Sequence, residues 1–134
     1  MTPAQIVLVQ QSFQQVLPIR GQAAALFYDR LFATDPSTRP LFGSTDMEEQ
    51  GQKLMATIGS VVAALDRPEI VVPAAQALAK RHVDYGVQDA HYDSVGAALL
   101  WTLEQGLGEA FTPETREAWA AAYALLSTTM RAAA

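Results

Sequence analysis

The sequence contains no cysteine. Disulfide bridges, thiolate metal sites and cofactors attached through sulfur are therefore excluded. The absence is compatible with a reducing compartment, and the N-terminus lacks the basic segment and apolar run of a secretory signal. We therefore expect a cytoplasmic protein.

Basic residues are also few. Nine Lys and Arg stand against 14 Asp and Glu, so the net charge is -5. This balance argues against a nucleic-acid partner, which would need a basic stripe. The longest apolar runs, such as residues 118–126, are too short to span a membrane. Half of the 134 residues are apolar, which is enough for one domain with a sizeable core, over residues 1–134.

Strand patterns are missing as well, because no useful segment alternates apolar and polar residues. Helix starts recur instead, with capping residues and prolines followed by apolar residues at helical spacing. The spacing predicts an all-α protein with six substantial helices and one short helix. The expected starts are near Thr2, Gly21, Asp35 (the short helix), Thr45, Pro73, Gln88 and Thr112. The Thr45 start has the pattern of a capping box, and Pro73 is taken to open the helix that ends before Gly86.

His82 is the first candidate for chemistry. Leu78 and His82 are four residues apart, so both point to the same side of their helix, while Lys80 and Arg81 point elsewhere. One interpretation is a core histidine bonded to a backbone carbonyl. The other is an imidazole presented to a metal.

Three further residues bear on this choice. Tyr28 and Gln50 each place a polar group in the apolar stripe of a helix, and Phe42 lies at a turn. The tyrosine hydroxyl could instead reach the surface, the glutamine could be solvated near its helix start, and the phenylalanine could pack on the core. If the two polar groups are buried, they need partners, and a ligand held between helices would supply them.

A single inward histidine limits the choice of cofactor. Zinc and di-iron sites need several protein ligands, and the only other histidine, His91, lies on a different stripe. A porphyrin already fills four coordination positions, so haem iron can be held by one imidazole. Haem is therefore the cofactor most consistent with His82.

The ordered set of segments then resembles a known family. The segments are LFYDRLF, DPSTRPLF, QKLMATIG, KRHVDYGV, HYDSVGAALLWTL and FTPETREAWAAAYALL. Over its whole length the chain is similar to single-domain bacterial globins and to the globin domain of flavohaemoglobins. From Lys80 onward it also resembles neuroglobin. The resemblance implies a globin fold, a 3-on-3 helical sandwich around a haem pocket.

The resemblance also implies roles for individual residues. His82 matches the proximal iron ligand and Phe42 the phenylalanine that stacks on the porphyrin. Tyr28, Gln50 and Leu54 match the distal side, where a diatomic gas binds. The remaining implied haem contacts are Lys53 at a propionate and Leu78, Val87, Tyr92 and Val95 along the proximal side and edge.

Two departures from the flavohaemoglobin pattern are visible. Residues 129–134 contain no acid where those proteins have a glutamate in the last helix, and we expect no flavin or nicotinamide domain behind the globin. Both put independent catalytic turnover in doubt. Gln50 replaces the distal histidine of neuroglobin, so ligation by two histidines is not expected.

The leading interpretation is a globin that binds oxygen reversibly at five-coordinate haem b, for transport or storage, with nitric oxide and carbon monoxide as further ligands. The tyrosine hydroxyl and glutamine amide would donate hydrogen bonds to the ligand. The alternative is a nitric oxide dioxygenase that works with a separate reductase. A haem-based sensor and a cofactor-free helical interaction module are weaker alternatives. We expect a monomer or a weak homodimer.

Overall fold

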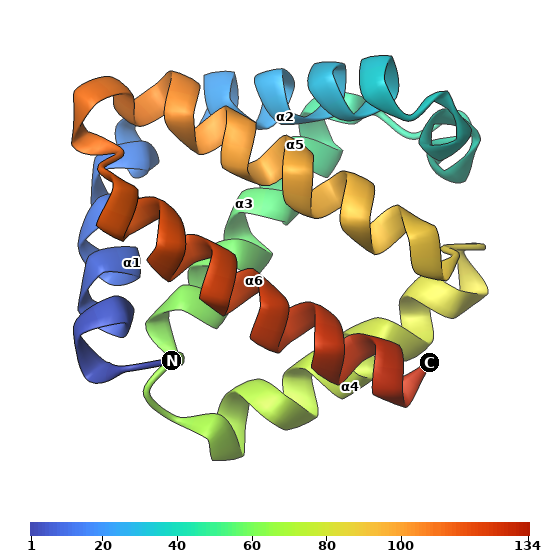
Figure 1. Ribbon diagram of the computed structural model, residues 1–134. Helices are drawn as coiled ribbons and strands as arrows, with labels where there is room; N and C mark the ends of the chain where they lie inside the picture. Colours follow the sequence, from blue (N-terminus) through green and yellow to red (C-terminus); the bar gives the residue numbers. More distant parts are fainter.

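The computed structural model describes residues 1–134, which form six α-helices, three short 3₁₀-helices and no strand (Figure 1). The all-α prediction is therefore confirmed. The elements are α1 Pro3–Val16, η1 Leu17–Ile19, α2 Arg20–Thr34, η2 Pro36–Phe42, α3 Met47–Ala63, α4 Pro68–Asp84, α5 Asp89–Leu107, η3 Gly108–Ala110 and α6 Pro113–Ala133. None of the helices is both long enough and apolar enough to cross a bilayer.

The sequence explains most helix ends. Thr2 and Gln5 form the capping box of α1, and Thr112 caps α6 ahead of Pro113. Gly86, which follows α4, has a φ of 92°, a conformation that glycine adopts at little cost.

Two predicted helix starts are wrong. The helix that carries His82 begins at Pro68, and Pro73 lies inside it. Pro68 occupies the first helical position, where a missing N–H costs nothing, so the earlier proline is the true start. The residue that caps α3 is Asp46 and not Thr45, because its carboxylate accepts the N–H groups of Glu48 and Glu49.

The helices cross in two directions. In Figure 1, α3 runs diagonally behind α5 and α6, and α2 lies behind α5 along the upper edge. The closely packed pairs include α1 with α6, α2 with α5 and with α3, and α4 with α6. Helices α3 and α4 follow one another in the chain, but they are not closely packed on each other.

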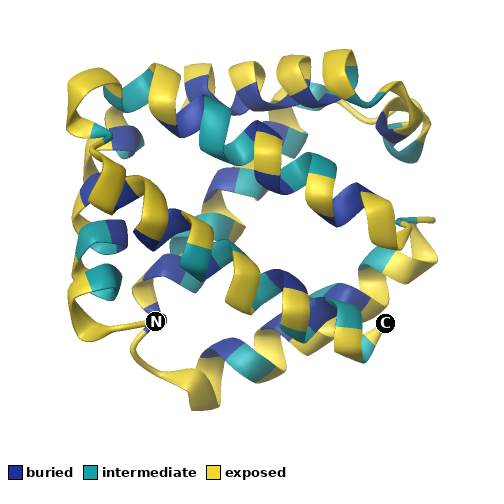
Figure 2. Ribbon diagram, in the orientation of Figure 1, coloured by how far each residue is buried: buried dark blue, intermediate teal, exposed yellow.

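Buried apolar side chains fall into three clusters, and Figure 2 shows them on the inward faces of the helices. The first and largest joins α1, α2, α3, α5 and α6. Phe13 and Trp119 lie in it, and the Trp119 indole donates a hydrogen bond to the Ser12 hydroxyl at 2.8 Å. The second cluster surrounds Tyr28, and the third lies between α4, α5 and α6. The two smaller clusters position the candidate site.

Candidate functional site

The residues singled out in the sequence come together in two groups. Tyr28, Phe42, Leu54 and Val95 belong to the second cluster or pack on it. Leu78, Val87 and Tyr92 belong to the third cluster or pack on it. The groups adjoin on α5, where Tyr92 and Val95 are three residues apart and thus neighbours on one face.

Tyr28 lies at the centre of the first group. Its side chain comes from α2 and is only 6% exposed, so the alternative of a hydroxyl that reaches the surface is wrong. The ring packs edge-on against Phe27 and Phe42 and stacks on Phe32, with centroids 5.0 to 5.8 Å apart. Burial raises the pKa of Tyr28, against a hydrogen bond from Gln50 that lowers it. The hydroxyl is therefore protonated at neutral pH and able to donate.

Gln50 brings α3 to the same point. Its amide nitrogen donates to the Tyr28 hydroxyl at 3.3 Å, and the side chain is half-buried. The Tyr28 hydroxyl accepts this hydrogen bond and donates none to another protein group. The pair thus combines two donors, one on each of two helices, and one of these donors is unused.

Phe42 and Lys53 differ in their surroundings. Phe42, the last residue of η2, is half-buried, and its ring also meets Phe32 at 5.6 Å. It therefore closes the aromatic cluster rather than projecting into solvent. Lys53 lies on the exposed side of α3, one residue before the half-buried Leu54.

His82 lies in the last turn of α4 and is half-buried. Its Nδ1 donates to the Leu78 carbonyl at 2.8 Å, because a carbonyl can only accept. This bond fixes the ring and leaves Nε2 as the free, basic nitrogen. Burial lowers the pKa of His82, the nearby Arg81 lowers it further, and the Leu78 bond opposes both. The imidazole is neutral at pH 7, which is the form that binds a metal.

The third cluster supports α4 from the other side. Ala75 and Ala79 of α4 pack there with Tyr92 and Met130, so small side chains hold α4 close to α6. Burial raises the pKa of Tyr92, in opposition to the nearby Arg131.

The donor set fits a haem. The unused groups are one histidine nitrogen and the Tyr28 hydroxyl proton, with the Gln50 amide beside it on a separate helix, and apolar side chains surround them. Helices α3 and α4 do not pack closely on each other. A flat group bound between them would contact one apolar side chain from each helix, Leu54 of α3 and Leu78 of α4. No group of three or more His, Cys, Asp or Glu side chains could hold a metal ion instead.

His91 does not compete with His82. Its Nδ1 accepts the backbone N–H of Gln88 at 2.9 Å, and its Nε2 lies 3.1 Å from the Ser37 hydroxyl. Both ring nitrogens are therefore engaged, and the side chain is buried. The sequence interpretation missed this role, although the Gln88–His91 spacing is that of a capping box.

Comparison with known proteins agrees with this geometry. The family model described as Globin matches residues 25–130. The chain belongs to the globin family. Globins bind haem and small gases, so this globin has haem as its cofactor and diatomic gases as its ligand class. The resemblance to the globin family stated from the sequence is thus confirmed.

The relatives of this globin are larger proteins. It is 37% identical over 115 residues to a flavohemoprotein of Bordetella parapertussis, covering 84% of this chain and 29% of that protein. It is 31% identical over 104 residues to a flavohemoprotein of Bacillus subtilis, covering 75% and 26%. A flavohemoprotein of Vibrio cholerae is 32% identical over 103 residues, covering 75% and 26%. The chain therefore spans less than a third of the length of these relatives.

A second arrangement was not expected from the sequence. Arg131, near the end of α6, binds the Asp93 carboxylate at 2.7 Å, and its guanidinium lies 5.3 Å from the centre of the Tyr92 ring. A cation thus lies in the C-terminal segment where flavohaemoglobins were expected to carry an acid. Charge alone could have suggested the pairing with Asp93, but the stacking on Tyr92 depends on how α5 and α6 cross.

Proposed function

We propose that this globin is a nitric oxide dioxygenase that holds haem b through His82 and converts nitric oxide and dioxygen to nitrate. The observation that carries the proposal is the hydrogen-bonded pair formed by the buried Tyr28 on α2 and the half-buried Gln50 on α3. Relatedness to flavohemoproteins favours this function over the reversible oxygen binding placed first in the sequence analysis.

Each group at the site has a defined task. Haem, when bound, supplies the iron at which a diatomic gas is held and activated. The neutral His82 imidazole would hold that iron through Nε2, and the hydrogen bond to the Leu78 carbonyl orients the ring. Tyr28 and Gln50 are hydrogen-bond donors and would stabilise negative charge that develops on a bound gas. Phe42 and Leu54 would exclude water from the bound gas, and the exposed Lys53 would meet a haem propionate. Val87 and Val95 complete the apolar wall.

The overall reaction needs one electron. Nitric oxide, dioxygen and one electron together give nitrate, in which the nitrogen gains two oxygen atoms. This globin spans at most 29% of the relatives' length, so we propose that a flavin-dependent reductase outside these 134 residues supplies the electron.

Reversible oxygen binding remains the second candidate. It is favoured by the absence of an acid in residues 129–134 and by the presence of Arg131 in that segment. An acid hydrogen-bonded to the proximal imidazole makes that imidazole a more basic ligand, which donates more electron density to the iron. Its absence suits reversible gas binding better than catalytic turnover.

Spectra and turnover distinguish the two functions. Purified protein reconstituted with haem should show a Soret band, and its reduced form should bind carbon monoxide. With a flavin reductase and NADH, the nitric oxide dioxygenase should consume nitric oxide catalytically and release an equal amount of nitrate. Tyr28→Phe should lower this turnover while the spectrum stays that of histidine-ligated haem. A stable oxygen complex with a single turnover would instead support the carrier.

We also propose that residues 1–134 form a single globin domain in a monomer or weak homodimer. The absence of cysteine supports a cytoplasmic location.

A further inference from the structure

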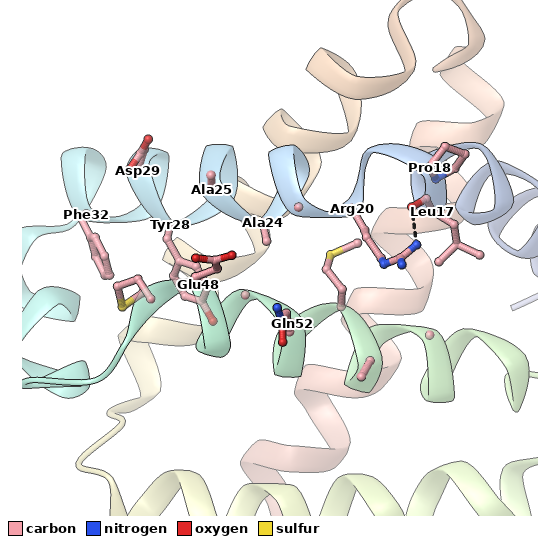
Figure 3. A pocket seen from close by; sticks show the side chains of 16 residues that line it. Leu17, Pro18, Arg20, Ala24, Ala25, Tyr28, Asp29, Phe32, Glu48 and Gln52 are labelled. Carbon is pink, nitrogen blue, oxygen red and sulfur yellow. Dashed lines mark hydrogen bonds between the residues drawn. The ribbon is translucent and has the colours of Figure 1, made fainter.

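A long groove lies between α2 and α3, on a face of this helix pair that the other long helices leave open (Figure 3). Its volume is about 870 Å³, and the residues that line it come from η1, α2 and α3 alone. Along α2 the groove runs from Arg20 to Phe32, which is about three and a half helical turns. The last turn of α4, which carries His82, therefore lies outside the groove.

Small side chains open the middle of the groove. Ala25 of α2 and Ala56 of α3 line it and are exposed, and a Cβ atom at Gly21 would meet no atom within 4 Å. Where the two helices touch, a Cβ at Gly51 would lie 2.9 Å from the Ala24 Cβ. The backbone of another helix can therefore approach α2 closely here, because only small side chains of α2 stand in its way.

The two ends of the groove carry opposite charge. Arg20 lies at the end near Leu17, and Asp29 and Glu48 lie near each other toward the other end (Figure 3). These three side chains are exposed, and none of them forms an ion pair within the chain. The Arg20 guanidinium donates to the Leu17 carbonyl at 3.0 Å, which leaves its charge without a carboxylate. One cation and two carboxylates are thus free to pair with a partner.

This charge pattern is complementary to itself. Arg20 and Asp29 are nine residues apart on α2, or roughly 14 Å along the helix axis. A second copy laid antiparallel on the groove, about a twofold axis, brings its Asp29 and Glu48 to Arg20 of the first copy, and the same pairing recurs at the other end. The midpoint between positions 20 and 29 falls at Ala24 and Ala25, where the side chains are small.

We propose that the α2–α3 groove is the contact surface of a twofold homodimer, in which Arg20 of each copy pairs with Asp29 and Glu48 of the other. The face is about 22 Å long over the 15 residues of α2 and about 20 Å wide for two helices, which gives roughly 440 Å² per copy. A standard interface buries about 800 Å² per partner, so this dimer is weak and dissociates on dilution. The inference goes beyond the proposed function, because no step of the gas chemistry depends on it.

Charge reversal tests the pairing. Arg20→Glu and Asp29→Arg each bring like charges together twice in the dimer, so each should raise the dimer dissociation constant by about tenfold or more. The two reversals change the net charge of -5 in opposite directions, so an effect of overall charge would raise one constant and lower the other. The double variant restores opposite charges across the interface and should dimerise more tightly than either single variant. Arg67→Glu is the control and should match the wild type, because Arg67 is exposed but does not line the groove.

Sedimentation velocity of the haem-reconstituted proteins, over concentrations up to the millimolar range, gives the dissociation constants. Circular dichroism checks that each variant is folded. A wild type that stays monomeric at every concentration would overturn the inference. Single reversals that act in opposite directions, or a double variant weaker than both, would overturn it as well.

Cross-linking tests the antiparallel arrangement independently. The chain has no cysteine, so one introduced thiol can form only an intermolecular disulfide. Ala25→Cys lies beside the proposed twofold axis and should form a disulfide dimer about tenfold faster than Ala33→Cys, because a disulfide needs the two Cα atoms within about 7 Å. Ala33 is the matched position, since it is exposed on α2 but does not line the groove. Non-reducing electrophoresis during oxidation gives both rates, and equal rates would overturn the inference.

Discussion

At the scale of single residues, the two sides of the site differ in how they are held. The His82 ring is oriented by a backbone carbonyl one turn earlier in the same helix, at 2.8 Å. Tyr28 is oriented by aromatic neighbours on α2 and η2 and by Gln50 on α3. The histidine geometry is therefore local, whereas the tyrosine geometry depends on three elements.

The first prediction concerns His82. His82→Ala should lose haem or retain it weakly, because no other side chain offers a free imidazole nitrogen. His91→Gln is the control and should keep a normal Soret band, since both His91 nitrogens are already bonded. Absorption spectra after gel filtration provide the measurement. A histidine-ligated spectrum in His82→Ala would refute the proximal role.

The second prediction concerns Tyr28. Tyr28→Phe keeps the ring and removes the donor, so oxygen should dissociate faster. A hydrogen bond to a charged group is worth roughly 1.5–3 kcal/mol. This corresponds to about a ten- to hundred-fold change in rate at ~1.4 kcal/mol per decade. Carbon monoxide gains less negative charge and should respond less. Stopped-flow dissociation is the measurement, and equal oxygen rates in the two proteins would show that the hydroxyl does not reach the ligand.

The third prediction concerns Asp35, which joins η2 to α5. Hydrogen bonds from Ser37 and then from Ser94 hold the pKa of this carboxyl below its usual range. A folded-state pKa that is depressed adds stability above the unfolded value of about 3.9, and this stability is lost as the pH falls through the folded value.

Asp35→Asn should therefore lower the thermal midpoint near neutral pH, and the difference from the wild type should shrink as the pH falls below about 4. Thermal melts followed by circular dichroism between pH 2 and 7 provide the measurement. Midpoint curves that stay parallel down to pH 2 would contradict the linkage.

At the scale of elements, helix crossings depend on small residues at the points of contact. Gly51 lets α3 approach α2, and Gly96 lets α5 approach α6. A Cβ at Gly96 would lie 2.7 Å from the Tyr123 ring, whose hydroxyl in turn donates to the Tyr92 carbonyl. The α5–α6 crossing and the Tyr92 backbone are therefore coupled.

The fourth prediction follows from that contact. Gly96→Ala should destabilise the protein by ~1–3 kcal/mol, because the methyl group overpacks the helix crossing. Gly21→Ala is the control, since its Cβ would meet open space, and it should stabilise by roughly 0.5–1 kcal/mol through helix propensity. Urea unfolding provides the free energies. Equal effects of the two substitutions would show that the α5–α6 contact yields without cost.

At the scale of the whole molecule, the arrangement of the clusters implies uneven stability. The largest cluster joins five helices, whereas the fully buried residues that α4 contributes to the third are the small Ala75 and Ala79. Because α4 does not pack closely on α3, it depends on α6 and on whatever lies between α3 and α4. A bound haem would connect the second and third clusters.

The fifth prediction is that haem stabilises the protein mainly through α4. A ligand at ~1,000 times its dissociation constant adds about 4 kcal/mol. Hydrogen exchange should be fast in α4 without haem and slow with it, while α1 and α6 near Trp119 change little. Mass spectrometry of peptides from both forms provides the measurement. Uniform protection across the chain would refute a localised effect.

The sequence by itself determined the helices and the place of His82. Capping boxes, prolines and apolar spacing act over one or two turns, so the sequence shows them directly, as at Thr2 and at the Leu78–His82 pair. Pro73 misled the interpretation because two prolines five residues apart can each open a helix, and only the conformation of residues 68–72 distinguishes them.

Only the tertiary structure decided the rest. The Tyr28–Gln50 bond and the position of Arg131 over Tyr92 each join two different helices. Their geometry depends on how closely two helices approach, which is decided where Ala24 meets Gly51 and where Tyr123 meets Gly96. No local pattern encodes that distance, because it results from the packing of side chains from both helices at once.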